Sequence, residues 1–278
     1  MVDVGSLKWR RRAKTTFLYA FMLFFSAPFI FVFVWMLMAS LKTYLQNSAI
    51  PPLLIFEPTL ENYYRVFTRT PIVQYFNNSV IVAIGSTGLG LLLGLPAAFS
   101  IALYRQHALA LAVLSSRIMP GITYLVPWFI LFSTLRLIGT HFAVMLSHLT
   151  VTMPLIIWIL IGFFEDLPSE IIDAARIDGC SIYSAFARVA LPLALPGVIV
   201  SGILAFIFSW NNFMLSLILG GSGARTLPVA VYGFISESQV DWGGLNATAT
   251  TVTLPVVFFV LIVQKHVVKG LTLGAVKG

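Results

Sequence analysis

The feature that most constrains this chain is a series of six long apolar stretches nearly free of charged side chains. A helix needs roughly 20 apolar residues to cross the hydrocarbon core of a bilayer. Charged residues make up 10% of the chain, whereas soluble domains carry roughly 25%. The sequence therefore predicts an all-α polytopic membrane protein with six transmembrane helices. The predicted spans are Phe17–Ser40, a span within Ile72–Tyr104, Ser116–Leu135, Ala143–Phe164, Pro196–Leu219 and Asn246–Gln264.

The formal charge of +7 does not indicate nucleic-acid binding, because the chain has no basic stripe interleaved with aromatic residues. Twelve of the 17 lysines and arginines fall on the side of the membrane that would hold both termini. They are Lys8, Arg10, Arg11, Arg12, Lys14, Arg105, Arg117, Arg176, Arg188, Lys265, Lys269 and Lys277. Cytoplasmic loops carry an excess of such residues, so both termini are predicted to be cytoplasmic.

The loops between the predicted spans divide the chain into three parts. Residues 1–71 comprise an N-terminal cytoplasmic tail, the first span and an outer loop, in which Thr59 is predicted to cap a short helix. Residues 72–268 form the core membrane domain, and residues 269–278 a cytoplasmic tail. Because Ile72–Tyr104 is too long for one simple span, its start, Ile72–Asn78, is predicted to be interfacial.

The large inner loop, residues 165–195, has the pattern of two helices. The first is predicted to begin near Pro168 and to end at Gly179, since glycine commonly terminates helices. The second would run over Ser181–Ala190, with Pro192 and Pro196 breaking it before the fifth span. A polar helical hairpin between two spans is suited to contact a protein outside the membrane.

The inner loop contains the motif Asp173-Ala174-Ala175, then Asp178-Gly179 and, after nine further residues, Val189-Ala190-Leu191-Pro192. This motif resembles the EAA loop of ABC importer permeases of type I. Aspartate replaces the usual glutamate of the motif and valine its isoleucine. The resemblance implies that Asp173, Ala174, Ala175, Asp178, Gly179, Leu191 and Pro192 couple the permease to a partner ATPase.

Four other segments resemble carbohydrate-uptake permeases, and the last of them is similar to the tail of the maltose-type second permease subunit. They are Leu53–Phe67, Phe76–Ser79, Trp210–Phe213 and Leu271–Gly278. This resemblance implies a heterodimer with a second permease subunit, two ATPase subunits and an extracytoplasmic binding protein that delivers the solute. It also implies alternating access in the cytoplasmic membrane of a bacterium or archaeon, with the tail lying between the ATPases.

The chain has no phosphate-binding loop of the form G-x-x-x-x-G-K-[ST], so it is not predicted to be an enzyme. No cofactor is expected in this chain, and ATP and Mg would be bound by partner subunits. The predicted spans also lack carboxylates between their ends, which argues against a secondary transporter and favours a neutral solute. The alternatives are an ABC importer for another small solute, a secondary transporter and a membrane-embedded enzyme.

Polar and aromatic side chains inside the spans are the candidates for contact with a sugar or polyol. Amides bind hydroxyl groups, and aromatic rings can stack on a sugar face. The candidates are Trp210, Asn211, Asn212 and Phe213 in the fifth span, and Tyr124 and Trp128 in the third. Hydrogen bonding between helices is the alternative role for the asparagines. Gly90 and Gly94 predict close helix packing, and the scattered histidines are expected to be packed rather than metal-bound.

Overall fold

A computed structural model describes residues 4–235 and 240–273 of the 278-residue chain. The regular elements of this part are helical, apart from an isolated bridge between Ile235 and Val240. The chain divides into two compact units, which are described separately. Unit 1 comprises Met1–Arg69 and Phe234–Thr251, and unit 2 comprises Thr70–Gly233 and Val252–Gly278.

Four helices are long and apolar enough to cross a membrane: α1 (Val4–Ser40), α4 (Ile72–Leu103), α7 (His141–Glu165) and α14 (Trp242–Leu273). Two sharply bent helix pairs bring the number of candidate crossings in the described residues to as many as six. The prediction of a helical protein with several membrane spans is therefore confirmed. All four long helices also overlap the spans predicted from the sequence.

The third predicted span, Ser116–Leu135, is not one helix. The structure has α5 (His107–Ser116) and α6 (Gly121–Thr134), which are bent by 85° relative to each other. Pro120 stands immediately before α6, and a proline disfavours helical geometry in the residue that precedes it. The 14 residues of α6 extend only about 21 Å at 1.5 Å per residue, so α6 alone is shorter than the hydrocarbon core.

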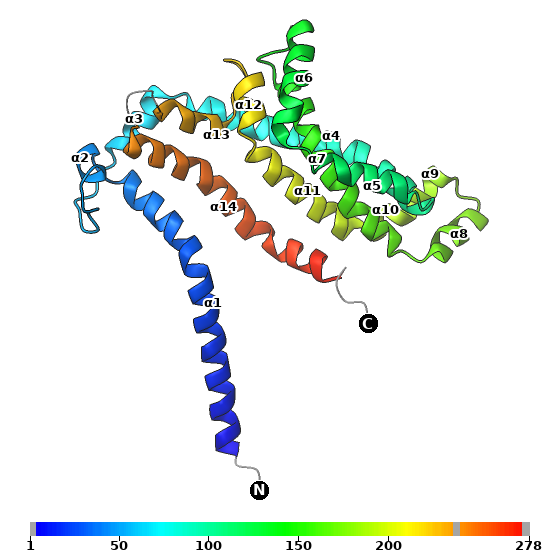
Figure 1. Ribbon diagram of the computed structural model, residues 1–278. Coiled ribbons are helices and arrows are strands. Elements are labelled where there is room, and N and C mark those ends of the chain that lie inside the picture. The colour runs from blue at the N-terminus through cyan, green and yellow to red at the C-terminus, as the bar shows by residue number, and fades with distance from the viewer. Residues whose placement is uncertain (1–3, 236–239, 274–278) are drawn as a thin grey trace. The chain divides into compact units, whose positions relative to one another are not determined.

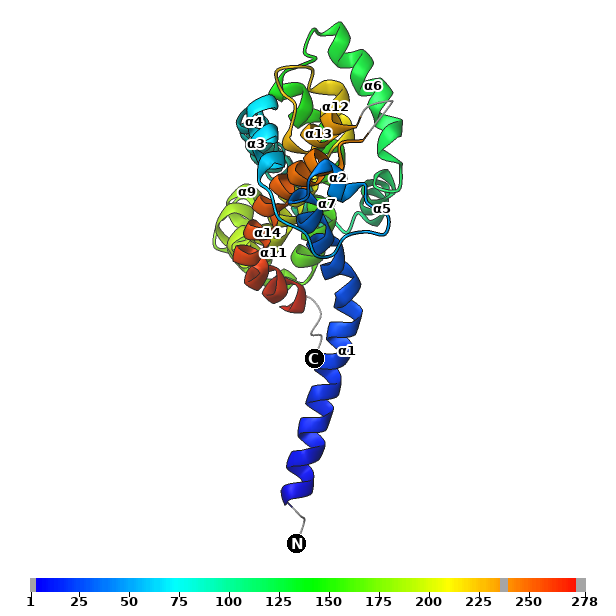
Figure 2. The ribbon, with the colours of Figure 1, turned by 90° about the vertical axis from the view of Figure 1, so that its left-hand side faces the viewer.

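Unit 2 is built around α4, α7 and α11 (Leu195–Trp210), which pack side by side (Figures 1 and 2). The predicted interfacial segment Ile72–Asn78 is continuous with the rest of α4. A Cβ atom on Gly90 would lie 2.8 Å from Cδ1 of Ile156 on α7, and one on Gly94 would lie 3.0 Å from Cγ2 of the same residue. The predicted role of these two glycines in close helix packing is confirmed.

The remaining elements of unit 2 are short. They are α8 (Ser169–Ile177), α9 (Ile182–Ala185), the π-helical turn η1 (Phe186–Ala190), α10 (Leu191–Leu193), α12 (Met214–Leu219) and α13 (Leu227–Ala230). Figure 1 shows α8 and α9 at one end of the α4–α7–α11 bundle and α12 and α13 toward the other. The 3-10 turn η2 (Val231–Phe234) follows α13. Figure 2 shows that α6 projects away from the bundle.

Unit 1 is held together by polar contacts around α3 (Glu61–Arg69). The hydroxyl of Thr59 accepts a hydrogen bond from the backbone N–H of Glu61 at 3.2 Å, which confirms the predicted start of this helix. Arg65 binds Asp241 through both carboxylate oxygens, at 2.8 and 3.3 Å. The buried amide of Asn62 donates to the carbonyls of Ser40 and Lys42, both at 2.8 Å. These bonds join α1, α3 and the start of α14.

The end of α1 is further fixed by Lys42, which is 2% exposed. Its ammonium group lies 4.9 Å from the ring centroids of both Trp35 and Phe56. Aromatic faces attract cations, and the attraction strengthens where water is excluded. Between Lys42 and α3, the chain forms the short helix α2 (Tyr44–Asn47), which Thr43 and Gln46 cap reciprocally.

We expect Gly197→Ala to destabilise the packing of α11 on α7. The new Cβ atom would lie 2.4 Å from Cγ of Phe163, which is closer than any normal contact and too near the ring's attachment point for easy relief. Overpacking of this kind typically costs about 1–3 kcal/mol. The purified protein should therefore melt several degrees lower than the unaltered chain in a thermal scan in detergent.

Gly162→Ala is the matched control, since this glycine is exposed on α7 and a Cβ atom there would meet nothing within 4 Å. It should leave the melting temperature unchanged or slightly raised, because alanine favours helix more than glycine does. Equal melting temperatures for the two variants would show that α7 and α11 are not packed as closely as described.

Candidate coupling loop and membrane pathway

The first helix of the inner loop, α8, ends as the sequence predicted. Gly179 has a φ of +89°, a left-handed conformation that glycine adopts without steric cost. The N–H of Gly179 donates to the carbonyl of Arg176 at 3.1 Å, and the N–H of Cys180 donates to that of Ala175 at 3.0 Å. This pair of bonds is a Schellman motif, which satisfies the carbonyls at the helix end. The motif turns the chain sharply toward the second helix.

The second helix begins where it was predicted, with the Ser181 hydroxyl accepting a bond from the N–H of Ser184 at 3.3 Å. The prediction that Pro192 breaks it is wrong. After the π turn of η1, α-helical geometry restarts at Leu191. The backbone is helical at Ala190 and Leu191, so the helix continues through Pro192 directly after the π turn.

The helical axis instead changes direction at Ala194, between α10 and α11. The segments Ile182–Leu193 and Leu195–Trp210 meet there at 78°. Pro196 lies in the first turn of α11, so it begins that helix, and no break is needed at Pro192. Leu191 and Pro192 thus belong to a straight extension of the second loop helix.

The loop is anchored to the membrane helices by aromatic side chains. The ring centroid of Phe186, in η1, lies 5.1 Å from that of Phe99 on α4 and 6.3 Å from that of Phe164 on α7. Phe99 and Phe164 themselves meet edge to face at 5.5 Å. Ile172 of α8 is buried in the same apolar cluster. Direct packing therefore connects the loop to the ends of α4 and α7.

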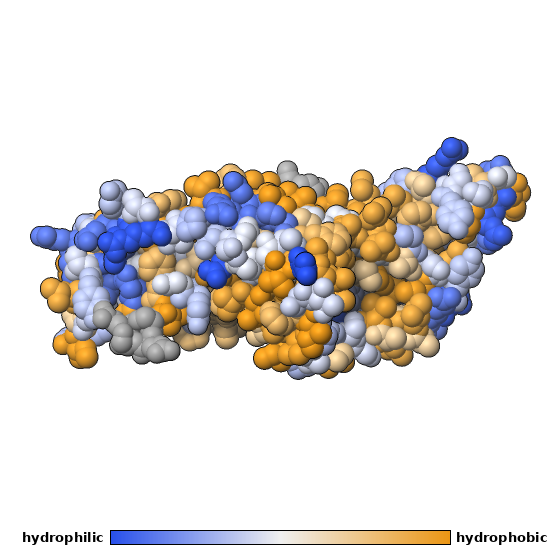
Figure 3. All heavy atoms as spheres, turned by 90° about the horizontal axis from the view of Figure 1, so that it is seen from above, coloured by the Kyte–Doolittle hydropathy of each residue, from blue (hydrophilic) through white to orange (hydrophobic). Residues whose placement is uncertain are grey.

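The opposite face of the loop is open. Asp173, Ala174, Asp178 and Gly179 are exposed and Ala175 is half-buried. Figure 3 shows hydrophilic surface at the end of unit 2 that carries α8 and α9, as one of several hydrophilic patches on this face. The predicted coupling residues are thus brought together on one accessible surface, apart from Leu191 and Pro192, which lie farther along the second helix.

Two apolar residues of this face were missed by the sequence reasoning. Ile177 at the end of α8 is 86% exposed, and Tyr183 in the first turn of α9 is 83% exposed. Exposed large apolar side chains in an otherwise polar loop are typical of an interaction surface. The signal in the sequence was an isoleucine directly before Asp178-Gly179, where a solvated helix end would normally be polar.

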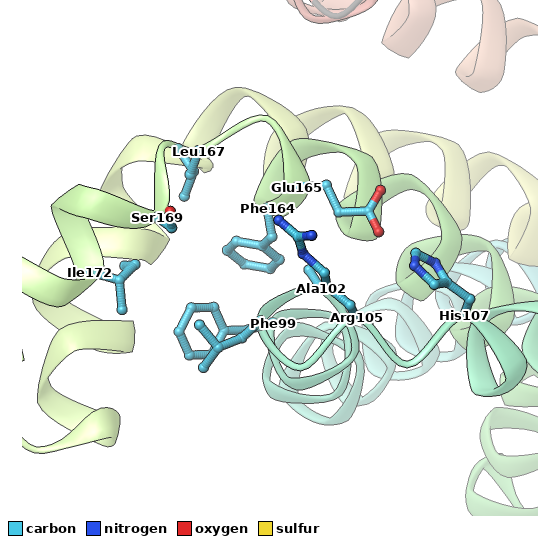
Figure 4. A pocket seen from close by; sticks show the side chains of 10 residues that line it. Phe99, Ala102, Arg105, His107, Phe164, Glu165, Leu167, Ser169 and Ile172 are labelled. Atoms are coloured by element: carbon cyan, nitrogen blue, oxygen red, sulfur yellow. The ribbon is translucent and has the colours of Figure 1, made fainter.

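A hollow of about 320 Å³ lies beside the loop, where α4, α5, α7 and α8 meet. Figure 4 shows the rings of Phe99 and Phe164 between Ile172 and the charged side chains of Arg105 and Glu165. Arg105 has a φ of +49°, an uncommon conformation for a residue other than glycine. The Gln106 N–H donates to the carbonyl of Ile101 at 2.9 Å, so Arg105 takes the position at the end of α4 that glycine usually fills.

The fifth predicted span, Pro196–Leu219, is broken in the structure. Helix α11 ends at Trp210 and α12 begins at Met214, so Asn211, Asn212 and Phe213 lie in the break rather than in mid-helix. The Asn211 side chain donates to the carbonyl of Ile207 at 2.9 Å. The Asn212 side chain accepts a bond from the N–H of Leu215 at 3.2 Å. Asparagine side chains compete in this way with helical hydrogen bonds, which explains the interruption.

Neither asparagine is seen in a hydrogen bond between helices, and Asn211 remains exposed. Trp210 is 3% exposed, and its ring packs between Phe76 and Phe206, each at a centroid distance of 5.8 Å. Trp210 therefore lies in the packed interior, whereas Asn211 and Phe213 face outward from it. Irregular backbone at membrane depth is tolerated where it is covered by protein or lines a water-filled cavity.

The two candidates in the third span lie elsewhere. The Tyr124 hydroxyl donates to the carbonyl of Ser116 at 2.6 Å, across the bend between α5 and α6. The Trp128 ring stacks on Phe132 at 4.8 Å. Both line a mainly apolar hollow of about 320 Å³ against α7. None of residues 210–213 lines this hollow, so the structure does not bring the two groups of candidates to one cavity.

Residues 4–273 match the model of the family described as the binding-protein-dependent transport system inner membrane component. The chain belongs to this family of ABC importer permeases. The match extends over both units and includes the inner loop. The prediction of a binding-protein-dependent permease of the ABC importer type is confirmed, and the function of the permease family is transport rather than enzymatic catalysis.

Two relatives of the permease are named for the transport of trehalose and sulfoquinovosyl glycerol. It is 36% identical to the sulfoquinovosyl glycerol transport system permease protein SmoH of Agrobacterium fabrum, over 90% of this chain and 89% of that one. It is 35% identical to the trehalose transport system permease protein SugB of Mycobacterium tuberculosis, over 79% and 82% of the two chains. A crystal structure of a bacterial ABC transporter involved in the import of alginate shares the fold. Its TM-score is 0.70 at 17% identity, over 94% of this chain and 97% of that one.

Proposed function

We propose that this permease forms the translocation pathway for a carbohydrate or polyol. The proposal is supported by two relatives at 35–36% identity that are named for a trehalose and a sulfoquinovosyl glycerol transport system. The solute would be delivered by an extracytoplasmic binding protein, on which the family depends by description. The companion in the pathway would be a second permease subunit, and the assembly would lie in the cytoplasmic membrane of a bacterium or archaeon.

The permease would cross that membrane six times, with both termini in the cytoplasm. The four long helices would supply four crossings, since each is long and apolar enough to span a membrane. The third crossing would be made by the bent pair α5 and α6, and the fifth by α11 with α12. At 1.5 Å per residue, α11 and α12 extend about 24 Å and 9 Å, which together match the roughly 30 Å hydrocarbon core.

The surface formed by α8 and α9 would dock onto the partner ATPases, two subunits of the assembly that would bind ATP and Mg. The single observation that carries this role is the exposure of Ile177 and Tyr183 on a loop whose other face is packed into the core. Asp173, Ala174, Ala175, Asp178 and Gly179 would frame the contact. Leu191 and Pro192 would extend the second helix toward Ala194, where movement of the loop reaches α11.

Closure of the ATPases would move the loop and shift the permease between inward-open and outward-open states. Such a shift requires a partner that binds one state more tightly than the other. Asn211 and Asn212, in the break between α11 and α12, would offer amide groups to solute hydroxyls, with Phe213 beside them. Trp210 would support this segment from the interior, while Tyr124 and Trp128 would line a separate apolar wall.

The C-terminal tail, residues 269–278, would lie between the ATPases. Its residues 274–278 are outside the described part of the chain, and residues up to Leu273 continue α14. No cofactor is proposed for the permease chain itself.

The proposal is tested by purifying the tagged permease from its native membrane and identifying the proteins that remain bound. We expect a second permease and an ATPase, and we expect ATP hydrolysis in proteoliposomes to rise when the binding protein and its sugar are added. Amino acids and phosphate serve as competing solutes in the same assay. Uptake that persists without ATP but requires a proton gradient would overturn the proposal in favour of a secondary transporter.

A further inference from the structure

His148 lies at the point where the broken fifth span meets α7. Its side chain is completely buried. The ring nitrogen Nδ1 lies 2.8 Å from the hydroxyl oxygen of Ser209, and Nε2 lies 3.3 Å from that of Ser216. Ser209 is in the last turn of α11, and Ser216 is in the first turn of α12. One imidazole ring therefore contacts both sides of the break.

A fourth polar group extends this cluster to α4. The Ser86 hydroxyl lies 2.8 Å from the Ser209 hydroxyl, and both residues are buried. A neutral imidazole has one N–H donor and one nitrogen acceptor. In one neutral tautomer, the Ser86 hydroxyl donates to Ser209, the Ser209 hydroxyl donates to Nδ1, and Nε2–H donates to Ser216. All three hydrogen bonds can therefore form without a net charge. The cluster thus joins α4, α7, α11 and α12 through neutral hydrogen bonds.

The break itself does little to fix the two helices relative to each other. The N–H of Asn212 donates to the carbonyl of Ser209 at 3.2 Å, which caps only the α11 side. The N–H of Leu215 donates to the Asn212 side chain, which caps only the α12 side. His148, in contrast, binds one side chain from each helix and is itself held in the long helix α7.

We propose that His148 is a positioning residue that sets the angle between α11 and α12 and thereby holds the Asn211–Phe213 segment in its transport-competent arrangement. The inference rests on the proposed function, because it assigns the break to the solute pathway. His148 is fully buried and would not touch the solute. Its effect would act through the two serines on the backbone that carries Asn211 and Asn212.

The experiment measures the arrangement of the two helices directly. Cys180 is the only cysteine, so a Cys180→Ser background allows spin labels at Phe208 on α11 and Ile218 on α12, which are 45% and 37% exposed. Distances between the labels are measured by pulsed electron spin resonance, with the full assembly in lipid nanodiscs. His148→Phe retains a ring of similar shape but removes both hydrogen bonds, and we expect it to broaden the distance distribution.

Transport is measured in the same variants without labels. We expect His148→Phe to lower the amount of solute transported per ATP hydrolysed at least fivefold, and His148→Gln, which keeps a donor and an acceptor, to restore part of it. Ser147→Ala is the control, since Ser147 is equally buried on α7 but donates to Val144 of its own helix. The control should match the unaltered permease in both measurements.

Ser216→Ala removes only the contact to Nε2, so it tests the inference if His148→Phe does not fold. An unchanged distance distribution in a folded His148→Phe or Ser216→Ala variant would overturn the positioning role. The distance measurement does not require ATP or solute, and therefore its outcome is separable from a failure of the proposed function, which would appear as an assembly without an ATPase.

Discussion

Gly179→Pro is expected to reduce solute uptake by the reconstituted transporter at least tenfold, although the chain still inserts into the membrane. Proline fixes φ near −65°, whereas the native φ at this position is +89°. It also removes the N–H that donates to the carbonyl of Arg176. The turn between α8 and α9 cannot form, so ATP hydrolysis should lose its dependence on the loaded binding protein. Parallel assays of uptake and of phosphate release check this.

Gly179→Asn is the matched control, because asparagine is among the residues that enter the left-handed region most readily. It introduces a side chain at the same exposed position but keeps the turn, and a Cβ atom there meets nothing within 4 Å. We expect at least half of the normal uptake. Normal uptake by Gly179→Pro would count against the coupling role of the loop, and equal loss in both variants would assign the effect to bulk at the surface rather than to the turn.

The double substitution Ile177→Asp with Tyr183→Ser is expected to lower the affinity of the permease for its ATPase at least 30-fold. These side chains are 86% and 83% exposed in the isolated chain. Truncation of a hot-spot residue, often a tyrosine near the centre of an interface, costs about 2 kcal/mol or more. A buried carboxylate without a partner would add to that cost. Retention of the ATPase on the immobilised permease, measured over a concentration series, gives the change.

Tyr44→Ser provides the control for this prediction. Tyr44 is an aromatic residue of α2 that is 49% exposed. It belongs to unit 1, whereas the loop belongs to unit 2. The variant should retain the ATPase as well as the unaltered permease does. Undiminished retention by the double variant would show that the ATPase binds another surface.

The inner loop could be predicted in detail because its signals are local. Gly179 ends α8 through a conformation that depends on one residue, and Ser181 starts the next helix through a bond to a residue three positions ahead. The long spans were also predictable, since hydropathy over some 20 residues depends on no distant contact. The failure at Pro192 has a different origin, because a single π turn directly precedes it, and the periodicity of so short a segment does not distinguish a π turn from an α-helix.

Other features were beyond the reach of sequence patterns. The break at Asn211 lies within an apolar stretch that hydropathy treats as continuous, and the nearby contact of His148 with Ser216 joins residues that are 68 positions apart. The ion pair of Arg65 with Asp241 joins residues separated by 176 positions. The separation of Tyr124 and Trp128 from Asn211 follows from the bend at Pro120, which redirects α6. The His148–Ser216 contact and the Arg65–Asp241 ion pair depend on tertiary contacts, whereas the break and the bend have local causes that an average of hydropathy does not register.

The 78° bend at Ala194 lets the second loop helix act as a lever on α11. Ile182–Leu193 is an arm of 12 residues and thus about 18 Å long. If it pivots at Ala194 by about 10°, its far end sweeps about 3 Å, a shift of the size that packed interfaces convert into a switch. In the proposed coupling, an ATPase that displaced the far end of this helix by about 3 Å would rotate it by about 10° at the base of α11. The displacement needed from the ATPase would accordingly be small, and transport would depend more on the rigidity of this helix than on its length.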